Sequence, residues 1–140
     1  MAGKILLEVV TPEKLLLSQE VDEVIAPGSE GEFGVLPGHC HLLSSLRIGE
    51  LRYKTQDAWH YMSILWGYAE VTPSKVTVMA EIAEKAEDID VGRAQQAVEK
   101  AEQRLQAGGL PSEVKEAQIS LENDRLQKKI ADRARKAGHA

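Results

Sequence analysis

The sequence has little cysteine, few aromatic residues and no long apolar run. Its 140 residues include one cysteine, Cys40, which excludes an internal disulfide and predicts a reducing compartment. No apolar stretch approaches the roughly 20 residues that span a bilayer, and Met1 is not followed by a pattern typical of a signal peptide. The formal net charge of −5 argues against nucleic-acid binding, because an acidic protein repels phosphates.

The composition changes near residues 84–88. Every aromatic residue, and every proline except Pro111, lies in residues 1–82. Residues 83–140 are instead rich in Ala, Glu, Gln, Lys and Arg. The sequence therefore predicts two domains, with residues 1–84 in the first and residues 85–140 in the second.

Short segments rich in β-branched residues, separated by turn residues, make up the first domain. Such segments, with turn signals roughly 8 to 12 residues apart, predict an antiparallel sandwich or barrel. Continuous strand–helix alternation is missing, which argues against a doubly wound nucleotide-binding fold. The predicted strands are residues 5–10, 21–26, 42–46, 49–53, 59–65, 68–71 and 75–80.

The sequence of the second domain predicts an antiparallel hairpin of two helices. Asp88 or Asp90 can cap the first helix, and Gly108-Gly109 ends it. Ser112 can cap the second helix, which is expected to run to about Lys136. Apolar residues three or four positions apart form the packing face of the first helix: Val91, Ala94, Val98, Ala101 and Leu105. Because small side chains dominate this face, both a detachable and a permanently packed hairpin are consistent with the sequence.

The sequence contains no recognisable catalytic constellation. His39-Cys40-His41 lacks the further ligands that a zinc site requires, and a Cys–His nucleophile would lack an orienting third group. Cys40 is therefore expected to be a buried, inert thiol. The glycine-rich stretch 28–34 lacks the Lys-Ser or Lys-Thr of a phosphate-binding loop and carries two carboxylates, so a hairpin turn is favoured.

Two charged features have both a structural and a functional interpretation. Asp90 and Arg93 at a helix start indicate either an N-cap with a local ion pair or a contact for a small anion. The basic end of the second helix is either a solvated face or a surface for an acidic partner. Its basic residues are Arg125, Lys128, Lys129, Arg133, Arg135 and Lys136.

Three motifs carry a resemblance to a known family. The string Gly-Ser-Glu-Gly-Glu-Phe-Gly-Val-Leu-Pro-Gly-His at residues 28–39 resembles the signature of the epsilon subunits of bacterial F-type ATP synthases. Leu65-Trp66-Gly67-Tyr68-Ala69-Glu70-Val71 and the stretch Ala86–Ala94, with its Ile-Asp-x-x-Arg-Ala string, are also similar to that family. The matches follow one another in order along essentially the whole chain.

The resemblance implies an all-β sandwich of about ten strands followed by an α-helical hairpin. It implies a non-catalytic rotor subunit that couples proton-driven rotation to ATP synthesis and inhibits ATP hydrolysis through its C-terminal helices. The sandwich would bind the gamma subunit and the c-ring, and the extended hairpin would reach the beta and alpha subunits. The protein would be peripheral, at the cytoplasmic face of the bacterial inner membrane. The alternative is a free-standing β-sandwich protein with a helical hairpin that senses a small ligand or a nucleotide. Co-purification with membrane ATPase subunits would distinguish the two.

The resemblance also implies three groups of site residues and no metal or cofactor. The residues expected to contact the c-ring and gamma subunit are Glu30, Glu32, Phe33, Pro37, Gly38, His39, His41 and Leu42. The residues expected to bind ATP as a regulatory ligand are Glu84, Ile89, Asp90, Arg93 and Ala94. The basic helix end named above would be inhibitory. Trp66 replaces a common glycine of the family, and Asn123 and Gln127 replace basic residues of ATP-binding members, so ATP binding is expected to be weak.

Overall fold

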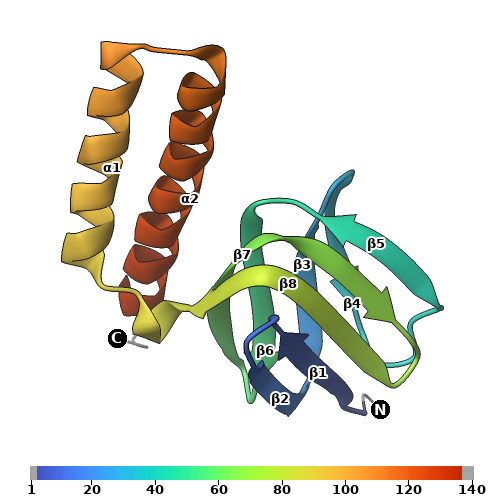
Figure 1. The fold of residues 1–140 in the computed structure, drawn as a ribbon. Coiled ribbons are helices and arrows are strands. Elements are labelled where there is room, and N and C mark those ends of the chain that lie inside the picture. Colours follow the sequence, from blue (N-terminus) through green and yellow to red (C-terminus); the bar gives the residue numbers. More distant parts are fainter. Residues whose placement is uncertain (1–2, 137–140) are drawn as a thin grey trace. The chain divides into compact units, whose positions relative to one another are not determined.

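A computed structural model describes residues 3–136, which form two compact units that divide between Lys85 and Ala86 (Figure 1). The described part of the first unit contains eight strands: β1 (Ile5–Val10), β2 (Leu15–Val21), β3 (Glu23–Gly28), β4 (Gly31–Val35), β5 (Leu42–Leu46), β6 (Gly49–Thr55), β7 (Ala58–Val71) and β8 (Lys75–Lys85). The second contains a 3₁₀ turn, Ala86–Asp88, and helices α1 (Val91–Ala107) and α2 (Pro111–Lys136).

The strands form a sandwich, as the sequence predicts. Their order is β2-β1-β8-β7-β5-β3-β4, and β6 pairs with both β3 and β7. Strand β7 is long because its first half pairs with β6, while its second half pairs with β5 (Figure 1). Strands β1 and β8 pair in parallel, which joins the first strand of the unit to the last.

The described residues contain eight strands rather than about ten. The expected strands 59–65 and 68–71 are one strand, β7, which continues through Trp66 and Gly67 at φ angles of 51° and 155°. Two observed strands lie outside the segments predicted from the sequence. Strand β2 has the polar centre Ser-Gln-Glu, which obscures its alternation, and β4 occupies part of the glycine-rich stretch for which the sequence predicts a turn.

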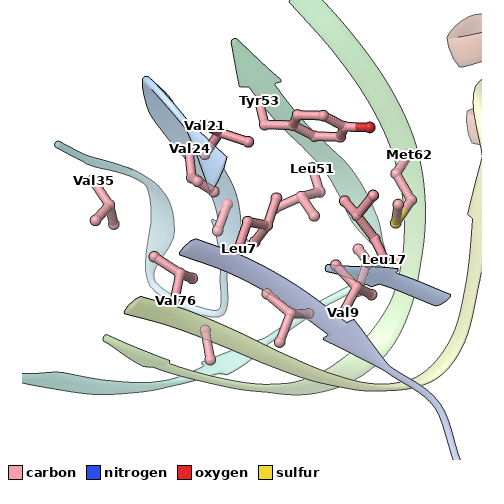
Figure 2. Packing of buried hydrophobic residues seen from close by; sticks show 14 of the residues in the cluster. Leu7, Val9, Leu17, Val21, Val24, Val35, Leu51, Tyr53, Met62 and Val76 are labelled. Carbon is pink, nitrogen blue, oxygen red and sulfur yellow. The ribbon is translucent and has the colours of Figure 1, made fainter. Parts of the chain in front are cut away.

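Alternating apolar side chains fill the sandwich. In β1, Ile5, Leu7 and Val9 are fully buried while the intervening residues are partly exposed, as the period of two of a strand requires. Leu51 and Met62, paired across β6 and β7, are also fully buried in this core (Figure 2). The core cluster runs from Ile5 to Ala80, so the first unit has its own hydrophobic interior.

The helical unit is an antiparallel hairpin with well-defined ends. Asp90 is the N-cap of α1, its Oδ1 accepting a hydrogen bond of 3.1 Å from the Arg93 N–H. Ser112 lies inside α2 and is not its cap, because the helix begins at Pro111, which fits the first helical position. Glu113 Oε2 accepts a hydrogen bond from the Leu110 N–H at 3.4 Å, as in a capping box.

The hairpin has a small apolar core. Val98, Ala101 and Leu121 form a buried cluster, and the partly buried Leu105 packs against it. An exposed ion pair between Arg125 and Glu102, at 3.4 Å, also links the two helices. Since small side chains dominate the interface, hydrophobic burial contributes modestly to holding the helices together. Neither helix in residues 3–136 is long and apolar enough to cross a bilayer.

Candidate functional site

The glycine-rich stretch forms the tight hairpin between β3 and β4. Gly28 and Gly31 are paired, and a Cβ at Gly28 would lie 2.7 Å from the Gly31 carbonyl oxygen and 2.9 Å from the Phe33 ring. Gly31 has a φ of 131°, which favours glycine. These glycines therefore serve close backbone approach in a hairpin. Glu30 is exposed at its tip.

Glu32, next to this tip, presents an ordered carboxylate. Its Oε1 lies 3.3 Å from Nη2 of Arg52, and half of its side chain is exposed. The Arg52 guanidinium is also 3.6 Å from the carboxylate of Glu50 on its own strand. One arginine thus orients Glu32 while leaving it accessible to a partner.

The hairpin tip is fastened to β5. The Ser29 N–H donates to the Ser45 carbonyl at 3.0 Å, and the Ser45 hydroxyl donates to the Ser29 hydroxyl at 2.7 Å. These two bonds hold the turn that carries Glu30 against a strand of the sandwich.

The segment from Leu36 to His41 forms a loop at the other end of β4. Gly38, with φ of 87°, donates its N–H to the Pro73 carbonyl at 2.8 Å, which ties the loop to the turn between β7 and β8. Cys40 is exposed, so the expectation of a buried thiol is wrong. It lies in a surface connection between two strands, where its side chain has no core to enter. No group of three or more His, Cys, Asp or Glu residues within 3–136 is placed to hold a metal ion.

The residues expected to contact rotor subunits lie on two surfaces. Glu30 and Glu32 are at the tip of the β3–β4 hairpin, whereas Pro37–His41 follow the far end of β4, whose five residues span about 14 Å. Leu42 and His41 line a depression of about 250 Å³ with Leu43, Glu70 and Val71. Phe33 is partly buried and packs against the core of the sandwich.

The residues expected to bind ATP are distributed over both units. Glu84 is in β8 of the first unit, and the other four belong to the second. Ile89 and Ala94 are buried, and Asp90 is engaged as the N-cap of α1. Arg93 is exposed, and no carboxylate of residues 3–136 forms an ion pair with it. The string therefore builds a helix start, with Asp90 as its cap and Arg93 as an exposed cation.

The basic residues of α2 differ in their surroundings. Arg125 pairs with Glu102, and Arg135 pairs with Asp132 at 3.0 Å; each arginine is more than half exposed. Lys129 and Lys136 are exposed. Asp124 lies among these basic residues, and its partial burial raises the pKa of its carboxyl above the usual value.

The sequence analysis missed an apolar groove on the sandwich. The groove has a volume of about 620 Å³ and is open to solvent. Its lining combines the segment after β1 with parts of β5, β7 and β8: Val10, Thr11, Pro12, Ser45, Leu46, Trp66, Gly67, Tyr68, Met79, Ala80 and Glu81. Trp66 was the one feature of the sequence that pointed to this surface, because the family that the sequence resembles commonly has glycine at this position.

Comparisons with known proteins cover nearly the whole chain. Residues 4–86 match the family model described as ATP synthase, Delta/Epsilon chain, beta-sandwich domain, and residues 87–131 match the model for the long alpha-helix domain of the same chain. An ATP synthase epsilon chain of Syntrophobacter fumaroxidans is 50% identical over 133 residues, which cover 95% of this chain and 99% of the relative. One from Citrifermentans bemidjiense is 47% identical over 137 residues, covering 96% and 98%.

Solved structures show the same fold at lower identity. A chain of the Euglena gracilis mitochondrial ATP synthase structure, comprising OSCP, F1 and c-ring, has a TM-score of 0.80 at 23% identity, over 92% of this chain and 82% of that one. A chain of the Tetrahymena thermophila mitochondrial ATP synthase central stalk and c-ring has a TM-score of 0.64 at 14% identity, over 93% and 98%.

Proposed function

The chain belongs to the ATP synthase Delta/Epsilon chain family, and from this premise we propose that it couples central-stalk rotation to ATP synthesis and restrains ATP hydrolysis through its helical hairpin. It is a non-catalytic epsilon-type stalk subunit. The division into two units supports two separate tasks, since the sandwich has its own core and the hairpin has another.

The sandwich is proposed to bind the gamma subunit and the c-ring. The carboxylates of Glu30 and Glu32 give the hairpin tip a negative surface that suits basic polar loops, because opposite charges favour encounter and register. The loop Pro37–His41 with Leu42 offers a second surface at the other end of β4. Two separate surfaces allow one small domain to contact two neighbouring subunits.

The hairpin is proposed to be the regulatory element. Its thin apolar interface and exposed ion pairs suit helices that dock in one state and extend in another. In the extended state, the basic end of α2 would meet acidic surfaces of the beta and alpha subunits. The assembled subunit would lie peripherally at the cytoplasmic face of the bacterial inner membrane.

The observation that carries this proposal is the similarity to epsilon chains over both units, with sequence identities of 50% and 47%. The test is affinity purification of the tagged chain from detergent-solubilised membranes. We expect alpha, beta, gamma and c subunits to co-purify. Recovery of the chain alone, stable and nucleotide-responsive, would instead support the free-standing sensor.

A further inference from the structure

We propose that residues 86–89, the 3₁₀ turn together with Ile89, form a latch that holds the C-terminal end of α2 in the folded hairpin. Release of this latch would free α2 to extend. The inference rests on the proposed function, because it assigns a control point to the same regulatory hairpin.

The latch and the end of α2 both bury apolar side chains. Ala86 and Ile89 are 4% and 8% exposed, although both precede α1. The 3₁₀ turn contacts α2, beside whose C-terminal end it lies (Figure 1). Three residues near that end are also buried: Ile130, Ala131 and Ala134. Ile130 is fully buried, so α2 has an apolar contact close to its end.

The antiparallel register of the hairpin brings Ile89 and Ile130 to the same level. Val98 and Leu121 belong to one buried cluster, which includes neither isoleucine. Ile89 lies nine residues before Val98, and Ile130 lies nine residues after Leu121. Because antiparallel helices rise about 1.5 Å per residue in opposite directions, both isoleucines lie about 13 Å from that cluster, toward the same end of the hairpin. The latch is therefore a second apolar contact, separate from the cluster.

Polar groups between the two apolar contacts destabilise the folded hairpin. Gln95 lies between the latch and Val98, and its buried Oε1 accepts no hydrogen bond from the described residues. Asp124, between Leu121 and Ile130, is partly buried, which raises the pKa of its carboxyl above the usual value. An unpaired buried acceptor and a desolvated carboxylate both cost free energy in the folded state. Loss of the latch would therefore leave the cluster as the remaining apolar contact of the hairpin.

The latch also directly follows the sandwich in the chain. Lys85 is the last residue of β8, and Ala86 is the first residue of the latch. A bend of the backbone at this junction therefore displaces one side of the latch. The cluster around Val98 lies farther along the chain and is not tied to the junction in this way.

The test follows hydrogen exchange of the backbone amides of the full-length chain by nuclear magnetic resonance, because exchange reports local opening. Ile89→Ala should speed exchange at residues 126–132 about tenfold or more, since truncation of a buried isoleucine removes its contacts and leaves a cavity. Ile89 precedes both helices, so faster exchange in α2 reports a lost contact and not a changed helix propensity. Ile130→Ala should act in the same way. The double variant should exchange little faster than either single variant, because both changes remove one contact.

Two variants are matched controls. Leu110→Ala truncates a side chain that is 63% exposed in the connection between α1 and α2, and it should leave exchange at residues 126–132 unchanged. Ile89→Leu keeps the apolar volume and should stay within a few-fold of the wild-type exchange rate.

The outcomes separate the latch from the proposed function. Unchanged exchange in Ile89→Ala would overturn this inference and leave the proposed function intact. A double variant whose effect is the product of the two single effects would overturn it too, by showing that the isoleucines act independently. In the assembled enzyme, Ile89→Ala should lower ATP hydrolysis severalfold at matched subunit content, because it favours the extended, inhibitory hairpin. Faster exchange with undiminished hydrolysis would support the latch and contradict the regulatory function proposed for the hairpin.

Discussion

The Glu32 carboxylate and the Arg52 guanidinium meet across the strands that flank β3, with Oε1 and Nη2 3.3 Å apart. Arg52 is mostly shielded, whereas half of the Glu32 side chain is exposed. The pair therefore holds an acidic group in one position at the surface, beside the hairpin tip.

That position predicts crosslinking between Glu32 and the c-ring. Glu32→Cys should form disulfide crosslinks to cysteines in the polar loops of the c subunit, because the proposed contact brings the two within bonding distance. The background must carry Cys40→Ser, since Cys40 is exposed and would compete. Leu15→Cys in the same background is the control. Crosslinks only to alpha or beta subunits, resolved by gel electrophoresis and mass spectrometry, would refute the assignment.

A chain of residues 1–85 should fold and assemble. The core cluster from Ile5 to Ala80 is complete within it, and β8 ends at Lys85. We expect a cooperative β-type melting transition by circular dichroism and recovery with gamma and c subunits in a pull-down. A chain ending at Ser74 is the control, because it lacks β8 and should not fold. An unfolded 1–85 product would show that the hairpin is needed for the sandwich.

Collective charge on α2 should control inhibition. An exposed ion pair contributes only about 0–1 kcal/mol, so single substitutions should change little. Replacing Arg125, Lys128, Lys129, Arg133, Arg135 and Lys136 together by alanine should raise ATP hydrolysis of the assembled enzyme. High salt should partly reproduce the effect. The measurement is membrane ATPase activity at matched subunit content. Lys100→Ala/Lys115→Ala, at exposed hairpin lysines, is the control. Equal ATPase activities of the six-residue variant and the wild type would exclude an electrostatic basis for the inhibition.

Gly67→Ala should destabilise the sandwich. The added Cβ would lie 2.1 Å from the Met79 carbonyl oxygen and 2.8 Å from the Ala80 Cα, and both are backbone atoms that cannot move aside easily. Strain of this kind typically costs about 1–3 kcal/mol or more. Chemical denaturation should show the loss of unfolding free energy. Gly34→Ala is the matched control, since a Cβ added at Gly34 would meet no atom within 4 Å, and an equal loss there would refute the explanation.

Asp124→Asn should stabilise the protein at neutral pH. Burial raises the pKa of the Asp124 carboxyl, so the folded state favours the protonated form. Its ionisation therefore costs stability as pH rises above the usual aspartate range, and this cost is absent in acid. The melting temperature of Asp124→Asn should exceed that of the wild type at pH 7 and match it near pH 3. A difference that does not change with pH would point to packing instead.

Local sequence patterns determined the element types and several of their ends. Alternation in Ile5–Val10 encodes one buried face of a strand, and the spacing from Val91 to Leu105 encodes one buried face of a helix. Asp90 was one of two residues that the sequence allowed as the cap, because the partner of a cap, here the Arg93 N–H, is only three residues away. These features depend on short-range geometry, which the sequence expresses directly.

Tertiary structure alone decided which distant segments meet. The parallel pairing of β1 with β8 joins residues about 70 positions apart, and no local pattern specifies that partner. Residues 59–65 and 68–71 belong to one strand, which passes through Trp66 and Gly67 without ending. This continuity depends on the close approach to Gly67 of the backbone of Met79, which belongs to another strand. The residues between 30 and 42 that are expected to contact partners are continuous along the chain, yet β4 separates the acidic tip from the loop. A sequence states which faces are apolar, whereas the packing of those faces against one another sets the surfaces that remain for partners.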